Sequence, residues 1–482
     1  MAAESVPGPL TAACGEVRPA SDGDAVAGVR PRYVAWPASV AEASAVLAAA
    51  AGLGLTVLPR GTGTRLAWGS PPRRCDLVVD TLRLDEVLEH EAGDLVARVQ
   101  AGVRIDELAD VLGLAGQQLS LDLPDAAGAG RGTVGGVLAT GAAGPRRLRY
   151  GTPRDLAIGI TVVLADGTVA HSGGKVVKNV AGYDIGKLFA GSYGTLGLIV
   201  EAAFRLHPVP AAAAFVTRDC AGPAAAQEMV AAAVGSPLAP SAAEIDRSAR
   251  GGPVRVSVLL EGDKAGVAER SALLRELLGR GASIAADPPA WWGRGGTAAA
   301  PDGTLIRITF WAGELAAVLD ALDAAATAAG LDPLVGGSAA AGVIYAAVPG
   351  AAPAASVAEL VTALRASRPL GPAGPAGPTE SARPTGPTGS AGRAGAMGSA
   401  GRAGTRGPTG SPGRAGRANG DEPGDGDGPP SRGSVVVQHA PAAVRAAVDV
   451  WGPVPSAGLM RAVKDQFDPG HRMAPGRMAG GI

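Results

Sequence analysis

Residues 366–433 constrain the fold of this 482-residue chain more than any other stretch. Glycine recurs at every third position from Gly386 to Gly416, and the same phase holds earlier at three more glycines. This is the period of collagen. The tract is either a short triple-helical or interaction segment, or a Gly/Pro/Ala/Ser linker that buries too little apolar surface to fold. We favour the linker, because glycine is missing at positions 380 and 383.

The segments flanking this tract read as one α+β unit. Residues 211–365 alternate predicted strands with predicted helices, for example VRVSVLLEG before AGVAERSALLRELLG. After the tract, SVVVQHA resumes as a strand and two helices follow. We therefore expect one sheet with helices packed on it, and the tract as a long insertion in one of its surface loops.

The residues before 211 carry local signals of a different kind. Ser39 and Glu42 form a predicted capping box at the start of a helix, and LTVLP reads as the buried strand after it. A short amphipathic helix is predicted over 104–113. Asp166 and Gly167 predict the turn of a hairpin, and GYDIGKLFAGSYGTLGLIVEAAFRL predicts a helix, a glycine turn and a strand.

The charge balance, the cysteine count and the hydrophobicity of the chain argue against several classes of protein. The 43 basic and 44 acidic residues nearly balance, which argues against nucleic acid as a partner. The three cysteines are far apart, so neither a disulfide framework nor a local metal site is indicated. The N-terminus does not resemble a signal peptide, and no run of about 18 strongly apolar residues predicts a membrane span. We expect a cytoplasmic protein whose only membrane association is through partners.

Glycine is dense in three separate places, at 59–65, 128–144 and 191–197. The first, PRGTGTR, alternates glycine with threonine directly after a predicted strand. Glycine lets a ligand approach the backbone without a Cβ in the way, and backbone N–H groups and hydroxyls can bind phosphate. Taken alone, each stretch could be a plain turn. Together they suit a large, extended, anionic ligand.

The order of these pieces resembles a known family. VRPRYVAWPASVAEASAVL, PRGTGTR, GTVGGVLATGAAGPRRLRYGTPRD and VKNVAGYDIGKLFAGSYGTLGLI are similar to the FAD-binding domain of the vanillyl-alcohol-oxidase (PCMH) type. The tail FDPGHRMAPGRM resembles that family's closing segment. Within the family, the chain most resembles the FAD-binding E subunits of bacterial glycolate oxidases (glycolate dehydrogenases).

The resemblance implies an α+β fold, with a two-subdomain PCMH-type FAD-binding domain and a smaller α+β cap domain that the Gly-rich insertion interrupts. The expected order is a 1–27 extension, a 28–210 FAD-binding domain, a 211–365 cap, a 366–433 disordered insertion, and 434–482 completing the cap and returning to the FAD domain.

The resemblance also implies the cofactor and its contacts. Residues 59–65 would hold the pyrophosphate of FAD, a second glycine cradle would follow the cofactor, and a third would line its adenine and ribose end. The implied cofactor-binding residues are Pro59, Arg60, Gly61, Thr62, Gly63, Thr64, Arg65, Gly132, Thr133, Gly135, Gly136, Gly141, Ala142, Gly191, Gly194, Thr195, Gly197 and Ile199.

Departures from the family pattern limit the implied chemistry. No histidine lies in 59–65 or 128–144, so we expect non-covalent FAD. Related hydroxy-acid dehydrogenases have GSEG where this chain has GSYG, which places Tyr193 in the position of a glutamate. Their histidine-rich metal motif has no counterpart here, so no metal is expected.

Oxidation of a 2-hydroxy acid needs a cation for the carboxylate and a base for the hydroxyl proton. Arg149 and Lys178 are the candidates by motif. Arg146 and Arg147 are better explained as solvated loop charges. The pair Trp291 and Trp292 would cover the flavin, face a partner or simply pack.

These features predict an FAD-binding subunit of a multi-subunit 2-hydroxy-acid (glycolate) dehydrogenase. It would relay electrons beside a catalytic flavoprotein subunit and an iron–sulfur subunit, with a small hydroxy acid as substrate of the whole complex. Two alternatives remain open, a self-contained FAD-dependent alcohol or hydroxy-acid oxidase and a non-catalytic scaffold with a flavin fold.

Overall fold

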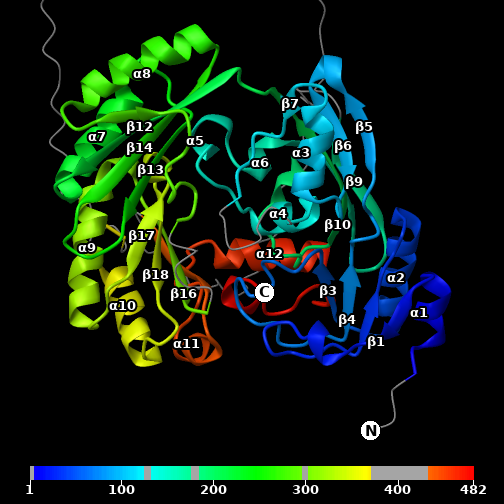
Figure 1. Ribbon diagram of the computed structural model, residues 1–482. Helices are drawn as coiled ribbons and strands as arrows, with labels where there is room; N and C mark the ends of the chain where they lie inside the picture. Colours follow the sequence, from blue (N-terminus) through cyan, green and yellow to red (C-terminus); the bar gives the residue numbers. More distant parts are fainter. Residues whose placement is uncertain (1–4, 124–131, 175–183, 296–301, 368, 371–432) are drawn as a thin grey trace, which may run out of the picture.

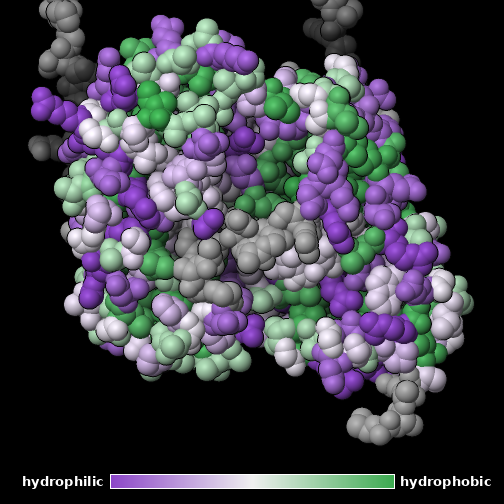
Figure 2. Space-filling view, viewed as in Figure 1, coloured by the Kyte–Doolittle hydropathy of each residue, from purple (hydrophilic) through white to green (hydrophobic). Residues whose placement is uncertain are grey.

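The computed structural model describes residues 5–123, 132–174, 184–295, 302–367, 369–370 and 433–482. Two halves lie side by side (Figure 1). One half contains the elements up to residue 208 together with the C-terminal tail, and the other contains an eight-stranded sheet. A recess separates their upper parts in the space-filling view, with apolar side chains on its wall (Figure 2).

The first half begins with a small sheet in the order β1-β2-β4-β3. Strand β4 pairs parallel with both β2 and β3, and the antiparallel β1 closes one edge. Helices α1 and α2 pack on this sheet around a core that includes Leu47, Leu77 and Val79. The bounds are α1 Gly8–Ala13, β1 Val17–Pro19, η1 Asp22–Asp24, β2 Tyr33–Ala35, α2 Val40–Gly52, β3 Val57–Arg60 and β4 Leu77–Asp80.

The start of α2 partly confirms the predicted capping box. The Ser39 hydroxyl accepts a hydrogen bond from the Glu42 backbone N–H at 3.1 Å. The Glu42 carboxylate accepts from the backbone N–H of Ala38 at 2.9 Å, one residue before the expected donor. The helix therefore has both capping interactions, but the reciprocal bond is displaced by one residue.

The second sheet of this half is antiparallel throughout, in the order β5-β6-β10-β8-β9. The predicted helix over 104–113 and the predicted hairpin at Asp166-Gly167 are confirmed as α3 and as the β8–β9 pair. The helix predicted around GYDIGKL is only a 3₁₀ turn, η4. The bounds are β5 Val87–Glu91, η2 Ala92–Asp94, β6 Val96–Gln100, α3 Ile105–Gly113, β7 Gln117–Gln118, α4 Val134–Thr140, α5 Arg147–Tyr150, α6 Pro153–Leu156, β8 Ala157–Val163, β9 Val169–Gly173, η4 Ile185–Leu188, β10 Leu198–Arg205 and β11 His207–Pro208.

The other half is built on one antiparallel sheet in the order β15-β12-β14-β13-β17-β18-β16-β19. Helices α7 to α10 cover its outer face (Figure 1). The bounds are β12 Ala212–Cys220, α7 Pro223–Gly235, β13 Ala242–Arg247, β14 Val254–Gly262, α8 Lys264–Leu278, β15 Ser283–Ala285, β16 Thr304–Thr309, η6 Ala312–Glu314, α9 Leu315–Ala328, β17 Leu334–Gly337, η7 Ala339–Ala341, β18 Val343–Val348, α10 Ala354–Ala366, β19 Ser434–His439 and α11 Ala442–Ala447. The tail that returns to the first half contains α12 Ala457–Phe467 and η8 Ala479–Gly481.

Side-chain alternation gives this sheet two different faces. Ile306, Ile308 and Ile344 point into the core beneath the helices. Their neighbours Leu305 and Tyr345 belong to a separate cluster on the opposite face, which carries no helices of its own sheet and is turned toward the first half. The predicted α+β fold is confirmed, although strands β13, β15 and β17 were missed.

The C-terminal tail returns to the first half and extends its small sheet. Val57 of β3 donates its backbone N–H to the carbonyl of Arg472 at 2.8 Å and accepts from the N–H of Ala474 at 2.7 Å. Lys464 of α12 fixes this return. Its buried ammonium donates to the carbonyl of Thr195 at 2.6 Å, to the Asp468 carboxylate at 2.6 Å and to the carbonyl of Met473 at 2.9 Å.

The glycine-rich tract lies outside the described residues, but its two flanks meet. Leu370 is buried in the core of the eight-stranded half, and a Cβ added at Gly433 would lie only 2.8 Å from the Leu370 side chain. Strand β19 follows at once and pairs antiparallel with β16. The chain thus leaves and re-enters the same sheet at nearly one point.

Within the described residues, no helix combines the length and apolar character needed to cross a membrane.

Deleting residues 371–430 is expected to leave the melting temperature within about 5 °C of the full-length value. The residues on either side of the tract already lie next to each other. The free-energy cost of closing a loop grows only logarithmically with its length, by about 0.6 kcal/mol per doubling, so shortening the loop changes stability little. Differential scanning calorimetry of both proteins measures this. A larger drop, corresponding to roughly 1 kcal/mol or more, would mean that the tract packs on the body.

Replacing Lys464 by Met is expected to lower the free energy of unfolding by about 3–5 kcal/mol, because it leaves the buried Asp468 carboxylate without its cation. Gln466→Met, on the exposed side of the same helix, is the control and should cost less than about 0.5 kcal/mol. Urea denaturation compares the two. Equal costs would show that the tail is not held by this ion pair.

Candidate functional site

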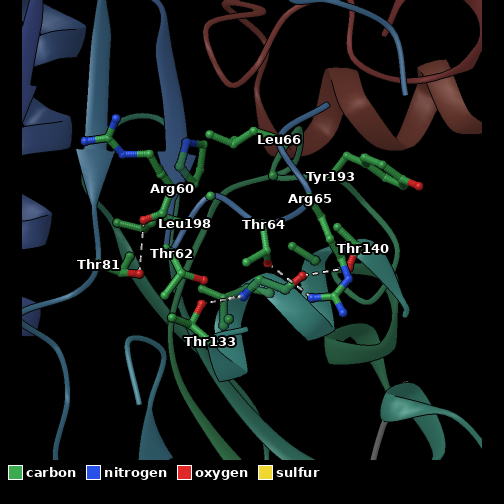
Figure 3. Close-up of a pocket in the computed structure, with 18 of the residues that line it drawn as sticks. Arg60, Thr62, Thr64, Arg65, Leu66, Thr81, Thr133, Thr140, Tyr193 and Leu198 are labelled. Atoms are coloured by element: carbon green, nitrogen blue, oxygen red, sulfur yellow. Dashed lines mark hydrogen bonds between the residues drawn. The ribbon is translucent and has the colours of Figure 1, made fainter. Parts of the chain in front are cut away.

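A cavity open to solvent at one side lies in the first half between the loop after β3, helix α4 and the start of β10 (Figure 3). Its lining comes from the predicted glycine stretches and from the tail: Pro59, Arg60, Gly61, Thr62, Gly63, Thr64, Arg65, Leu66, Thr81, Thr133, Gly135, Gly136, Ala139, Thr140, Tyr193, Gly194, Gly197, Leu198, Ile199 and Arg477.

Arg60 fixes the point where β3 ends and the first wall begins. Its guanidinium pairs with Asp80 at 2.8 Å and with Asp24 at 3.1 Å. Burial alone would raise the pKa of Asp24, but hydrogen bonds from Arg18, Ser21 and Arg60 together hold that pKa well below its usual range. Because two carboxylates already neutralise it, Arg60 supports the loop and has little charge to offer a ligand.

Gly61 and Gly63 have distinct structural reasons to be glycine. A Cβ at Gly61 would lie 2.2 Å from the hydroxyl oxygen of Thr133, so only glycine lets the loop touch the start of α4. Gly63 has a φ of 78°, a conformation that disfavours other residues. Close approach of chain to chain therefore explains Gly61. The hydroxyls of Thr62, Thr64, Thr133 and Thr140 gather at this junction (Figure 3).

The second wall is the start of α4. Thr133 caps the helix, since its hydroxyl accepts from the backbone N–H of Gly136 at 3.2 Å. The resemblance implied that Gly135 contacts the cofactor. Gly135 lines the cavity, but a Cβ there would point at Ala101, 2.8 Å from its Cβ, so the missing side chain is explained by packing. A Cβ at Gly136 would meet only the Thr133 hydroxyl, at 3.1 Å, so Gly136 is the glycine that opens toward the cavity.

The third wall is the turn before β10. Tyr193 and Gly194 both have positive φ, 55° and 74°, and a Cβ at Gly194 would press on Pro59 at 3.0 Å. The Tyr193 N–H donates to the carbonyl of Ala139 at 2.8 Å, and the Gly191 N–H donates to Leu138 at 2.9 Å. The end of α4 therefore holds this turn in place.

Five of the predicted cofactor-binding residues do not line the cavity: Gly132, Gly141, Ala142, Gly191 and Thr195. Gly141 ends α4 with a φ of 63°, and Thr195 presents its carbonyl to Lys464. Sequence reasoning missed several lining residues, above all Arg477. The only available signal was the tail motif APGRM, whose arginine was not singled out.

Of the two catalytic candidates, Arg149 does not line the cavity. Arg149 donates to the Ser241 hydroxyl at 3.4 Å and stacks on Tyr150, so it joins α5 to the eight-stranded half. Lys178 lies outside the described residues. Arg146 is no free loop charge, because it pairs with Glu261 across the two halves at 2.8 Å.

Trp291 and Trp292 also lie away from the cavity lining. Trp292 packs edge-on against Phe215, and Arg255 stacks on Trp291. Packing is therefore sufficient to explain this pair. In the described part of the chain, His, Cys, Asp and Glu side chains nowhere gather in a group of three or more that could hold a metal ion.

Comparisons with known proteins agree with this geometry. A family model described as an FAD binding domain matches residues 31–173. Glycolate oxidase subunit GlcD of Bacillus subtilis is 37% identical over 180 residues, which is 37% of this chain and 38% of that protein. D-lactate dehydrogenase of Archaeoglobus fulgidus is 40% identical over 175 residues, 36% of this chain and 38% of that protein. The matched region thus spans well under half the length of these relatives.

Solved structures share the fold over a larger part of the chain. p-Cresol methylhydroxylase superposes with a TM-score of 0.59 at 14% identity, covering 74% of this chain and 86% of that one. Alkyldihydroxyacetonephosphate synthase gives 0.57 at 19% identity, covering 70% and 71%. At these identities the likeness shows the fold alone.

Gly136→Val is expected to weaken FAD binding at least tenfold while leaving the melting temperature of the apoprotein nearly unchanged, because its side chain would enter the cavity. Gly135→Val should instead lower the apoprotein's melting temperature, since its side chain would collide with Ala101. Flavin content and calorimetry separate the two effects. Full FAD content in Gly136→Val would contradict this description of the cavity.

The cavity fits an extended dinucleotide, because glycine backbone and threonine hydroxyls form its walls and no acidic side chain lines its described part. The chain therefore contains an FAD-binding domain over residues 31–173, and FAD is its cofactor.

Proposed function

We propose that this chain is the FAD-binding subunit of a multi-subunit 2-hydroxy-acid dehydrogenase, with glycolate as the expected substrate of the complex. One relative is named as a glycolate oxidase subunit, and others are named D-lactate and D-2-hydroxyglutarate dehydrogenases. All three act on, or are named for, small 2-hydroxy acids. The region that this chain shares with these relatives is the FAD-binding part. The substrate is therefore inferred from the names of the relatives.

The composition of the cavity lining carries the proposal that the chain works with partners. Its ionisable groups are three arginines and Tyr193; the described lining contains no carboxylate, imidazole or amine. FAD, when bound, supplies the two-electron oxidation of an alcohol carbon. A base for the hydroxyl proton typically contributes about 10²–10⁴-fold to such a reaction. The described residues of the lining would hold and orient the cofactor, but none of them offers such a base.

The proposed cofactor contacts follow from the three walls. Backbone N–H groups of the loop at 61–64 and the hydroxyls of Thr62 and Thr64 would hold the pyrophosphate. The start of α4, open at Gly136, would follow the cofactor along its length. The turn at 193–199 would enclose the remaining end. A catalytic flavoprotein subunit and an iron–sulfur subunit are the proposed partners, and the latter would carry electrons onward.

One observation favours a second candidate, a self-contained oxidase. Glu244 lies on the helix-free side of the eight-stranded sheet, only 3% exposed, and burial raises its pKa to about 8 although the Ser338 hydroxyl donates to it. A carboxyl that exchanges its proton near neutral pH suits general acid–base chemistry. It does not line the described cavity, so we rank this candidate second.

Anaerobic mixing of the FAD-loaded chain with glycolate or D-lactate distinguishes the two. Without partners, we expect the flavin absorbance near 450 nm to fade at least about 10²-fold more slowly than with the partner subunits added, because the base is missing. Dithionite reduction provides the control for full bleaching. Rapid, complete bleaching of the isolated chain by either hydroxy acid would contradict the subunit proposal and favour the oxidase.

A further inference from the structure

An aromatic contact joins the eight-stranded half of the molecule to a wall of the cofactor cavity. Trp451 follows α11 and packs against the core of the eight-stranded half. Its ring lies edge-on to the ring of Tyr193, with centroids 5.1 Å apart and an interplanar angle of 85°. Tyr193 belongs to the third wall of the cavity, whereas Trp451 does not line its described part. The pair therefore connects the cavity to residues that never reach the cofactor.

Trp451 also contacts the tail and the loop that follows the first wall. Its indole N–H donates to the carbonyl of Arg477 at 3.1 Å, and Arg477 lines the cavity as well. A Cβ added at Gly69 would lie 3.1 Å from the Trp451 ring and 3.4 Å from the Tyr193 ring, so glycine makes room for both. The Gly69 N–H donates to the carbonyl of Gln438 on β19 at 3.2 Å. This one tryptophan thus contacts three separate segments of the first half.

The backbone of Tyr193 makes the contact important for the cavity. Its φ of 55° lies in the left-handed region, which is uncommon for a bulky residue and persists only where the surrounding structure holds it. The Tyr193 N–H donates to the carbonyl of Ala139 at 2.8 Å, and the ring is held against Trp451. In Figure 3 this ring extends away from the threonines of the glycine loop. Loss of the ring contact would let the turn relax and would move Gly194, which lines the cavity.

The contacts that α5 makes between the halves bypass the cavity lining. Arg146 pairs with Glu261 at 2.8 Å, and Arg149 donates to the Ser241 hydroxyl at 3.4 Å. Neither arginine lines the described cavity. These contacts are therefore independent of the cofactor, whereas the Trp451 contact has two lining residues, Tyr193 and Arg477, as its partners.

We propose that Trp451 is a positioning residue for the cofactor and that, through Tyr193, it couples occupancy of the FAD cavity to the contact between the two halves. FAD against the third wall would restrict the turn, and the restricted turn would hold Trp451. A coupling free energy is reciprocal, so loss of the Trp451 contact must weaken FAD binding, and FAD must protect the Trp451 segment. The inference depends neither on the substrate nor on partner subunits.

Titration of the full-length apoprotein with FAD tests one direction of the coupling. Trp451→Leu should raise the Kd for FAD at least about fivefold, although the residue lies outside the described lining. Trp451→Phe keeps a ring against Tyr193 and should recover most of the affinity. Trp311→Leu removes a tryptophan of the same half that is 69% exposed, and this matched control should change the Kd less than about twofold. Circular dichroism checks that each variant is folded at the assay temperature.

A double-mutant cycle tests whether the effect passes through the ring of Tyr193. In a Tyr193→Leu background the contact is already lost, so Trp451→Leu should change the Kd for FAD little further. Fully additive effects of the two substitutions would overturn the assigned route. An equal loss of affinity in Trp311→Leu would overturn it as well, because the effect would then not be specific to the contact.

Hydrogen exchange of the unmodified chain tests the opposite direction and needs no variant to fold. FAD should slow exchange in peptides covering residues 448–455 and leave exchange in α8 unchanged. Equal exchange at 448–455 with and without FAD, or an unchanged Kd in Trp451→Leu, would overturn the proposal. None of these measurements involves a hydroxy acid or electron transfer, so the proposed function stands or fails separately.

Discussion

The buried ammonium of Lys464 connects the parts on which the cofactor cavity depends. It bonds at once to the carbonyl of Thr195, to Asp468 and to the carbonyl of Met473. One side of this junction is the turn that forms the third wall of the cavity. The other is the tail, which pairs with β3 and brings Arg477 to the lining. A residue more than 250 positions from the glycine turn thus determines where that turn lies.

The presence or absence of an acidic partner distinguishes arginines that stabilise the loop from arginines that can bind a ligand in the cavity. Arg60 pairs with two carboxylates and is a structural residue of the loop. Arg65, five residues later, has no acidic partner among the described residues. Arg60 and Arg65 belong to the same short motif, and only the three-dimensional structure shows that their roles differ. Likewise Arg146 appeared to be a loop charge but pairs with Glu261 of the other half. Ion pairs made between distant segments decide which cations remain available for a ligand.

Local chemistry made much of the fold predictable. The 104–113 helix, the Asp166-Gly167 hairpin and the alternation after residue 211 were confirmed because each depends on neighbours in sequence. The glycine stretches pointed to the cavity, but not to the direction of each Cβ. Gly135 packs on Ala101 while Gly136 opens inward, a difference set by the strand that α4 touches. Arg477 reaches the cavity from the tail, hundreds of residues away from the glycine loop, and no local pattern encodes that contact.

The most direct test of this account is the flavin content of the purified full-length chain after acid precipitation. We expect about one FAD per chain, released completely into the supernatant, because the proposed contacts to the cofactor are backbone groups and hydroxyls and no histidine or cysteine lines the described part of the cavity. Flavin that remains bound to the precipitated protein, or a chain that binds no flavin when FAD is supplied in excess, would contradict it.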